Sequence, residues 1–146
     1  MKVTQQLADE IKRCVVFLME HRGRCFDGWP ASQLYKFCAY HWLNGTLFAS
    51  CAPDGAFRLV VIAWLENAAR IIARAAAGTP HFTWEQLPKD GDSILIADVV
   101  GERSLLPDVR RQVNGAWPDS PRKRLFAFRK GRLVELAWPT IDRLTA

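Results

Sequence analysis

One segment of the chain, residues 93–136, constrains the fold more than any other. It opens with the most apolar strand pattern in the sequence, Ser93–Val100, which a polar turn joins to a helical pattern at Ser104–Ala116. Two short strand patterns, Lys123–Phe128 and Arg132–Leu136, follow around a Lys-Gly turn. Because a continuous apolar run is typical of a strand buried on both faces, we expect Ser93–Val100 to lie at the centre of a sheet.

The first half of the chain supplies helices and a hairpin. Apolar residues recur at helical spacing over Gln5–His21 and Ala31–Leu43, and the alanine-rich stretch Glu66–Ala77 also has a helical pattern. Two apolar runs, Thr46–Cys51 and Phe57–Leu65, flank a Pro-Asp-Gly turn. This arrangement predicts a β-hairpin, because proline and glycine suit the backbone angles of a tight turn.

The order of these elements predicts the fold class. It runs helix, helix, strand, strand, helix, strand, helix, strand, strand, which indicates a mixed α/β (α+β) protein with one mixed central sheet flanked by helices. The remaining segment, His81–Leu87, has the composition of either a short strand or a loop. A chain of 146 residues, 49% apolar and 24% charged, has the size and balance of a single globular domain, residues 1–146.

The chain is basic, and its excess charge is concentrated near the C-terminus. Its formal net charge is +5 and its pI is about 9.3. Such a patch favours an anionic partner, such as nucleic acid, a phosphorylated cofactor or an acidic protein; the alternative is a solvated face that keeps the protein in solution. The basic residues concerned are Arg103, Arg110, Arg111, Arg122, Lys123, Arg124, Arg129, Lys130 and Arg132.

The use of cysteine and the hydropathy of the chain indicate the cellular compartment that we expect. The four cysteines form no Cys-x-x-Cys pair, and no His, Asp or Glu cluster has the spacing of metal ligands, so we expect no metal site. The polar start of the chain lacks a signal-peptide pattern, and no apolar stretch approaches the ~20 residues of a membrane span. We therefore expect a cytoplasmic protein with no membrane span. Buried thiols in a reducing compartment best explain Cys14, Cys25, Cys38 and Cys51.

The turn after the central strand is the candidate site, because ligands of α/β proteins gather beyond the carboxyl ends of such strands. Asp98 lies within the apolar strand, where burial would raise its pKa toward that of a useful base. The alternative is a carboxylate that accepts hydrogen bonds from local amides or faces solvent. Gly101–Ser104 could present amides and Arg103 to a phosphate. Alternatively, it is an ordinary connection in which Ser104 caps the helix.

Three pieces of sequence carry a resemblance to a known family. They are Gly28–Ser32 with its Trp-Pro pair, Ile62–Leu65 with its Trp, and Ile96–Gly101 with its internal Asp. With the order of elements, they make the chain similar to the GNAT acyltransferase fold. Within that superfamily it most resembles the toxin-activating lysine acyltransferases of RTX haemolysin operons. The likeness covers roughly residues 26–136.

The resemblance implies an acyl transfer from a pantetheine carrier, either acyl carrier protein or coenzyme A, to an amine such as a protein lysine. It implies no permanently bound cofactor. The pantetheine arm would lie beside Ile94–Val100, and its pyrophosphate would meet Gly101–Ser104. Backbone amides near Val99 and Val100 would hold the thioester oxygen. The donor-binding residues implied are therefore Val99, Val100, Gly101, Arg103 and Ser104.

The chain departs from that family at the catalytic histidine. The family has a histidine three residues before the Trp-Pro pair, where this chain has Phe26. The nearest histidine is His21, so the implied catalytic residues are Asp98 and His21, one of which would handle the proton. His41 lies in an aromatic helical pattern and is interpreted as structural.

The basic hairpin is the expected partner surface. Arg122, Lys123, Arg124, Arg129 and Lys130 would dock an acidic acyl carrier protein. Single-stranded nucleic acid is the rival, because aromatic residues lie among these bases. However, Phe126 and Phe128 alternate with charged or small residues and are expected to face the core, and no nucleic-acid motif is present. Members of the family are often dimers, and the aromatic content permits a homodimer.

Two other classes of function stay open at this point. The missing family histidine suits a non-catalytic interaction module on the same fold, for example in a phage or mobile element. The net positive charge suits a basic nucleic-acid-binding protein, whose affinity would fall steeply with salt.

Overall fold

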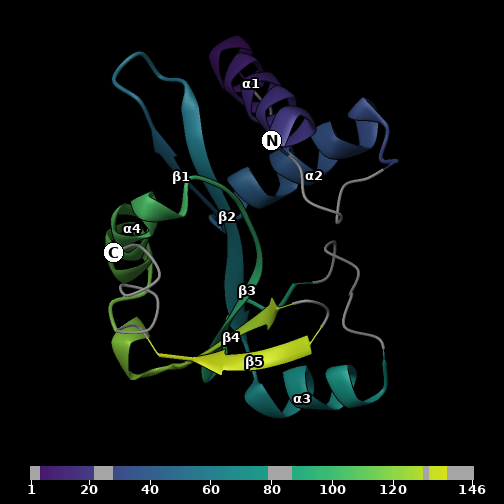
Figure 1. Cartoon of the computed structure of the whole chain (residues 1–146), viewed down its shortest axis with the longest axis vertical. Coiled ribbons are helices and arrows are strands. Elements are labelled where there is room, and N and C mark those ends of the chain that lie inside the picture. Colours follow the sequence, from purple (N-terminus) through teal and green to yellow (C-terminus); the bar gives the residue numbers. More distant parts are fainter. Residues whose placement is uncertain (1–3, 22–27, 79–86, 130–131, 138–146) are drawn as a thin grey trace.

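The computed structural model describes residues 4–21, 28–78, 87–129 and 132–137 (Figure 1). Its helices are α1 (Gln5–His21), α2 (Ala31–Leu43), α3 (Ala68–Ala76) and α4 (Leu106–Ala116), with 3₁₀ turns η3 (Arg103–Leu105) and η4 (Ser120–Arg122). Its strands are β1 (Leu47–Cys51), β2 (Phe57–Glu66), β3 (Ser93–Gly101), β4 (Arg124–Arg129) and β5 (Arg132–Leu136).

The described strands form one sheet in the order β1-β2-β3-β4-β5. Its neighbours are antiparallel except β3 and β4, which are parallel and joined by the crossover that contains α4. The expected α/β class, with a mixed central sheet flanked by helices, is confirmed. The expected central place of the apolar strand Ser93–Val100 is confirmed as well, because β3 has neighbours on both sides.

Helices cover both faces of the sheet (Figure 1). The face covered by α1, α2 and α3, which we call the α1–α2 face, buries the strand residues Val60, Ile62, Trp64, Leu95, Val100 and Phe126. The opposite face, which we call the α4 face, buries Leu59, Val61, Ala63, Ile94, Ile96 and Leu125 against Leu106, Val109 and Val113. Burial of apolar surface on both faces is the main force that holds this sheet together.

The bounds of most elements agree with the sequence patterns to within one or two residues. The expected helix at Glu66–Ala77 is shorter, because Glu66 ends β2 and α3 begins at Ala68. The expected helix at Ser104–Ala116 begins with the 3₁₀ turn η3, and α4 itself starts only at Leu106, next to Pro107. Ser104 makes no capping hydrogen bond, so the interpretation of this residue as a helix cap was wrong. Most of the uncertain segment His81–Leu87 lies outside the described residues.

The cysteines behave differently from one another. Cys14 and Cys38 are fully buried free thiols between α1 and α2, as expected. Cys51 is exposed, which corrects the expectation of a buried thiol. The reason is its place at the end of the edge strand β1, immediately before the exposed hairpin turn. Cys25 lies outside the described residues.

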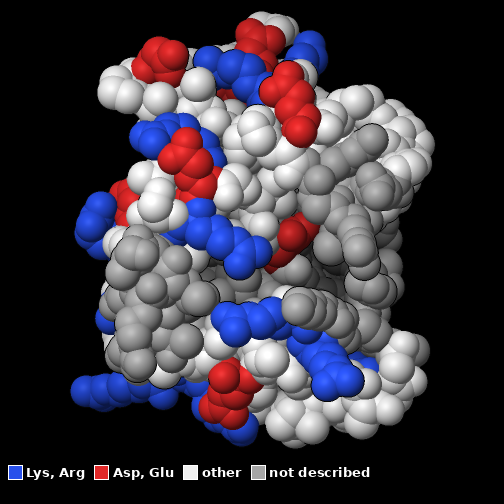
Figure 2. All heavy atoms as spheres, in the orientation of Figure 1, with Lys and Arg blue, Asp and Glu red and all other residues white. Residues whose placement is uncertain are grey.

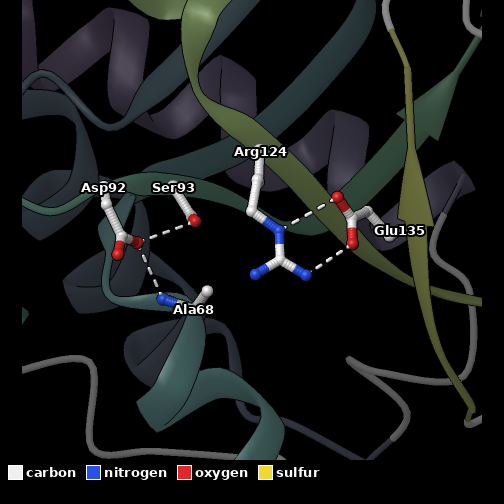
Figure 3. A network of polar contacts seen from close by, with 5 residues as sticks. All are labelled: Ala68, Asp92, Ser93, Arg124 and Glu135. Carbon is white, nitrogen blue, oxygen red and sulfur yellow. Dashed lines mark hydrogen bonds and ion pairs between the residues drawn. The ribbon is translucent and has the colours of Figure 1, made fainter.

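The start of β3 holds α3 in place through a polar network (Figure 3). Asp92 Oδ1 accepts hydrogen bonds from the amide of Ala68 at 2.9 Å and from Ser93 Oγ at 2.8 Å. The Ala68 amide is the largest cause that lowers the pKa of Asp92 below its usual value, followed by the Ser93 hydroxyl. Asp92, which is distant from α3 in sequence, therefore accepts a hydrogen bond from one of the free amides at the N-terminus of this helix.

Candidate functional site

The parallel strands β3 and β4 separate halfway along β3. They pair at four positions, from Ser93 opposite Arg124 to Ile96 opposite Ala127. Beyond Ile96, β3 runs on to Gly101 beside β2, and among the described strands it has no second neighbour there. Figure 1 shows β3 continuing next to β2 while β4 stays with β5. Within the described ranges, the backbone edge of β3 therefore has no strand partner over its C-terminal half; we call this the open edge of β3.

A β-bulge coincides with this separation. Ile62 of β2 lies opposite Asp98, whereas the next residue, Ala63, lies opposite Ile96, so Ala97 is an extra residue in β3. Directly opposed residues of an antiparallel pair point to the same face of the sheet. Asp98 therefore lies on the α1–α2 face with Ile62, whereas regular alternation from Ile96 would have placed it on the apolar α4 face.

The half-buried Asp98 is partly satisfied within its own strand. Its Oδ1 atom accepts a hydrogen bond from the amide of Val99 at 2.9 Å. The Val99 amide is therefore already engaged and is not available for the thioester oxygen. The side chain of Val99 packs on the α4 face and that of Val100 is buried on the α1–α2 face, so these two donor-binding candidates line opposite sides of the strand.

Gly101 ends β3 where the chain crosses Arg58 of β2. Its φ is +117°, a left-handed angle that favours glycine, and a Cβ atom there would lie 2.2 Å from the carbonyl oxygen of Arg58. The next amide, that of Glu102, donates to the same carbonyl at 2.9 Å, and the two side chains form an ion pair of 2.6 Å between Arg58 Nη2 and Glu102 Oε2. These contacts fix the position from which the turn leaves the sheet.

The turn after Gly101 offers a small anion-binding surface. Arg103 and Ser104 are exposed, and among the described backbone hydrogen bonds their amides donate to no other residue. Two features reduce the number of free donors: the amide of Leu105 already donates to the Glu102 carbonyl at 3.1 Å, and Pro107 has no amide proton. The groups that could meet a phosphate are therefore the two free amides and the Arg103 guanidinium.

His21 lies at the Gly101 end of β3 rather than at Asp98. It is exposed at the C-terminus of α1, where its Nδ1 atom is 3.1 Å from the carbonyl oxygen of Phe17 and its ring stacks on the Phe17 ring at 4.4 Å. Phe17 in turn reaches Gly101, since a Cβ there would lie 2.9 Å from Phe17 Cζ. The contacts of His21 are with Phe17 and do not include Asp98. The structure therefore does not bring together the two residues implied as catalytic.

His41 is a fully buried residue of the α1–α2 face. Its Nδ1 atom is 2.7 Å from Thr46 Oγ1, and the same hydroxyl lies 3.2 Å from the His41 carbonyl oxygen. The ring stacks on Trp64 at 5.8 Å. Burial lowers the pKa of His41 to about 4. It is therefore neutral near pH 7, as a histidine within a core should be.

The expected basic partner surface is partly used within the protein. Lys123 is largely buried and its Nζ donates to the Gly91 carbonyl at 2.6 Å, while Arg124 makes a two-pronged contact with Glu135 at 2.7 and 3.0 Å. Arg122 and Arg129 are exposed, and Lys130 lies outside the described residues. On the face in Figure 2, basic side chains are interspersed with acidic ones.

The described part of the chain brings no three His, Cys, Asp or Glu side chains together as metal ligands. None of its helices has the length and hydrophobicity that crossing a bilayer requires. No family model, curated protein or solved structure matches the chain. Its function must therefore be argued from the geometry at the open edge of β3.

Proposed function

We propose that the protein transfers an acyl group from a pantetheine carrier to an amine, such as a lysine side chain. The observation that carries this proposal is the separation of β3 from β4 at a bulge beside a half-buried carboxylate. Pantetheine is an extended arm with amide groups, so it can pair with the open edge of β3 as a further strand would. The resemblance to GNAT acyltransferases, noted from the sequence, points to the same strand.

The residues around this edge have complementary roles in the proposal. The amides of Arg103 and Ser104, with the Arg103 guanidinium, receive the phosphate end of the carrier. The thioester then lies beside Asp98 and Val99. The amine nitrogen attacks the thioester carbon, the carbon–sulfur bond breaks, and the carrier leaves as its thiol. Asp98 accepts the proton that the neutral amine loses and passes it to the leaving sulfur. His21 has no part in this step, because its contacts are with Phe17.

The carrier is either coenzyme A or an acyl carrier protein. The exposed guanidinium groups of Arg122 and Arg129 suit the acidic surface of a carrier protein. Lys123 is bound by the Gly91 carbonyl and the exposed Arg124 by Glu135, which leaves fewer unpaired charges for a nucleic-acid partner than the sequence suggested. We therefore favour the carrier over nucleic acid.

The test combines donor binding with transfer. Acetyl-coenzyme A and acyl-loaded carrier protein are offered with a lysine-containing acceptor peptide, and release of free thiol is followed. The Asp98→Asn variant should lose at least about 100-fold in rate, the usual contribution of a general base, while its unfolding temperature stays unchanged. Asp90→Asn is the matched control, because Asp90 is an exposed aspartate before β3. Full activity of Asp98→Asn would contradict the assignment.

A second candidate is a non-catalytic interaction module. The observation that favours it is the hydrogen bond of Asp98 to its own strand, together with the absence of His21 from the Asp98 contacts. It predicts that no acyl donor raises the melting temperature. A donor-dependent increase decides for the transferase, since a ligand stabilises the folded state to which it binds.

A further inference from the structure

A small apolar cavity lies between the sheet and α4. Its volume is about 20 Å³. The cavity is adjacent to strands β2 and β3 on one side and α4 on the other, and it is lined by Ala63, Ile94 and Ile96 from the sheet and by Val109, Arg110 and Val113 from the helix. An apolar space of this kind stays dry and suits an apolar group.

The cavity is adjacent to the end of the β3–β4 pairing, because one residue belongs to both. Ile96 is the last residue of β3 that pairs with β4, and its side chain lines the cavity. Val99, the residue beside which the proposed thioester lies, packs on the same α4 face. Val61, the residue of β2 opposite Val99, also lines the cavity, so the cavity is the apolar space beside the proposed thioester on this face.

The bulge separates the two substrates. Because Asp98 is opposite Ile62, its carboxylate lies on the α1–α2 face, whereas the cavity lies on the α4 face. The amine would approach the thioester from the Asp98 side, and the acyl group would point to the other side. This arrangement leaves the nucleophile's path clear of the acyl chain.

We infer that this cavity receives the acyl group of the donor and restricts it to short chains, of about two or three carbons. About 10–15 Å³ is needed to hold a single water-sized group, so the cavity takes one or two methyl or methylene groups beyond the carbonyl. This inference rests on the proposed function. The walls are closely packed side chains, with Val109 and Val113 each 3% exposed. A longer chain would have to displace them, which well-packed cores resist.

The experiment measures the affinity of the whole protein for free, acetyl-, butyryl- and octanoyl-coenzyme A by calorimetry. Affinity should rise from free to acetyl-coenzyme A, by about fourfold for each methyl or methylene group buried, gain little more at butyryl, and fall at octanoyl. Val109→Ala enlarges the cavity and should shift the best chain length upward. The control Val15→Ala removes the same atoms from the α1–α2 face, where Val15 is 6% exposed, and should leave the preference unchanged. Ile96→Val, a smaller change in the cavity wall, gives the same shift if Val109→Ala does not fold.

The outcomes separate this inference from the proposed function. If free coenzyme A and its acyl forms all bind with the same affinity, in the unaltered protein and in the variants, the cavity does not select the acyl group. That result would overturn the inference, while the binding of the donor would still support the proposed function. If octanoyl-coenzyme A binds best to the unaltered protein, the short-chain limit is wrong. If no form binds, the proposed function falls, and the inference falls with it.

Discussion

Asp98 of β3 lies directly opposite Ile62 of β2, although the next pair along β2 joins Ala63 to Ile96. The extra residue, Ala97, is what moves the carboxylate from the face of α4 to the face of α1 and α2. The same place marks the end of the pairing between β3 and β4. One local irregularity thus creates both the open edge and the position of the only carboxylate within β3.

Deletion of Ala97 tests whether the bulge is what ends the pairing between β3 and β4. Without the bulge, Asp98 keeps its place opposite Ile62, and β3 can continue its pairing toward Phe128 of β4. We expect the variant to fold with stability equal to or above that of the unaltered protein, and to lose binding of coenzyme A. Chemical denaturation and calorimetry measure the two properties separately. Undiminished binding by a folded variant would show that the bulge is not needed.

The buried His41 predicts a loss of stability in weak acid. Its pKa is lowered from 6.5 to about 4 by burial, so the unfolded chain takes up the proton first as the pH falls. This contribution is complete above pH 6.5 and is lost between pH 6.5 and 4, amounting to about 3 kcal/mol at 1.36 kcal/mol per pH unit.

The measurement is the free energy of unfolding in urea at pH 7 and pH 4.5. Because several carboxylates also titrate in this range, the comparison is made with His41→Phe, which keeps the ring against Trp64 but cannot take up a proton. The variant should lose distinctly less stability on acidification. Equal losses in both proteins would mean that His41 is not the group responsible.

Gly101 is expected to tolerate no side chain. Alanine at this position would combine a left-handed φ with a Cβ atom 2.2 Å from the Arg58 carbonyl, and strain of this kind costs about 1–3 kcal/mol. Gly115→Ala is the control: nothing lies within 4 Å of a Cβ there, and the residue is in α4. It should be neutral or stabilising by up to about 1 kcal/mol. Thermal unfolding of both variants checks the contrast, which equal stabilities would contradict.

Asp92 is predicted to hold the start of α3. Asp92→Ala removes the acceptor for the Ala68 amide and the Ser93 hydroxyl, so the melting temperature should fall (Figure 3). The lowered pKa of Asp92 means that its contribution is present above its ordinary value of 3.8 and is lost as the pH falls below it. The difference in stability between the variant and the unaltered protein should therefore be larger at pH 7 than at a pH below 3.8. A difference in stability that does not change with pH would show that the Asp92 carboxylate is not the cause. Asp90→Ala is the matched control.

The elements of the fold were largely predictable from the sequence, whereas the geometry of the site was not. Helical periodicity predicted α1 and α2 with the bounds that the structure has, and the apolar run predicted the central strand. The bulge at Ala97 was not predictable, because it depends on which residue of β2 lies opposite each residue of β3.

Long-range contacts explain the other differences. From the sequence, Lys123 and Arg124 were expected to be free surface charges. In the folded protein, Lys123 donates to the carbonyl of Gly91, which is distant in sequence, and Arg124 pairs with Glu135 on the neighbouring strand β5. Asp92 gave no signal as a helix cap, because it follows α3 by many residues. Asp98 itself was predicted as a site residue from its place in an apolar strand, and its assignment as a catalytic residue stays a prediction.

The central claim is that the open edge of β3 holds a pantetheine donor, and amide chemical shifts test it most directly. Acetyl-coenzyme A is titrated into the ¹⁵N-labelled protein, and the amide resonances of all residues are followed. We predict that the largest shifts fall on residues 97–104, with smaller ones on Ala127–Arg129 of β4, and that the helix α3 is unaffected. An unchanged spectrum, or shifts confined to other surfaces, would contradict the account.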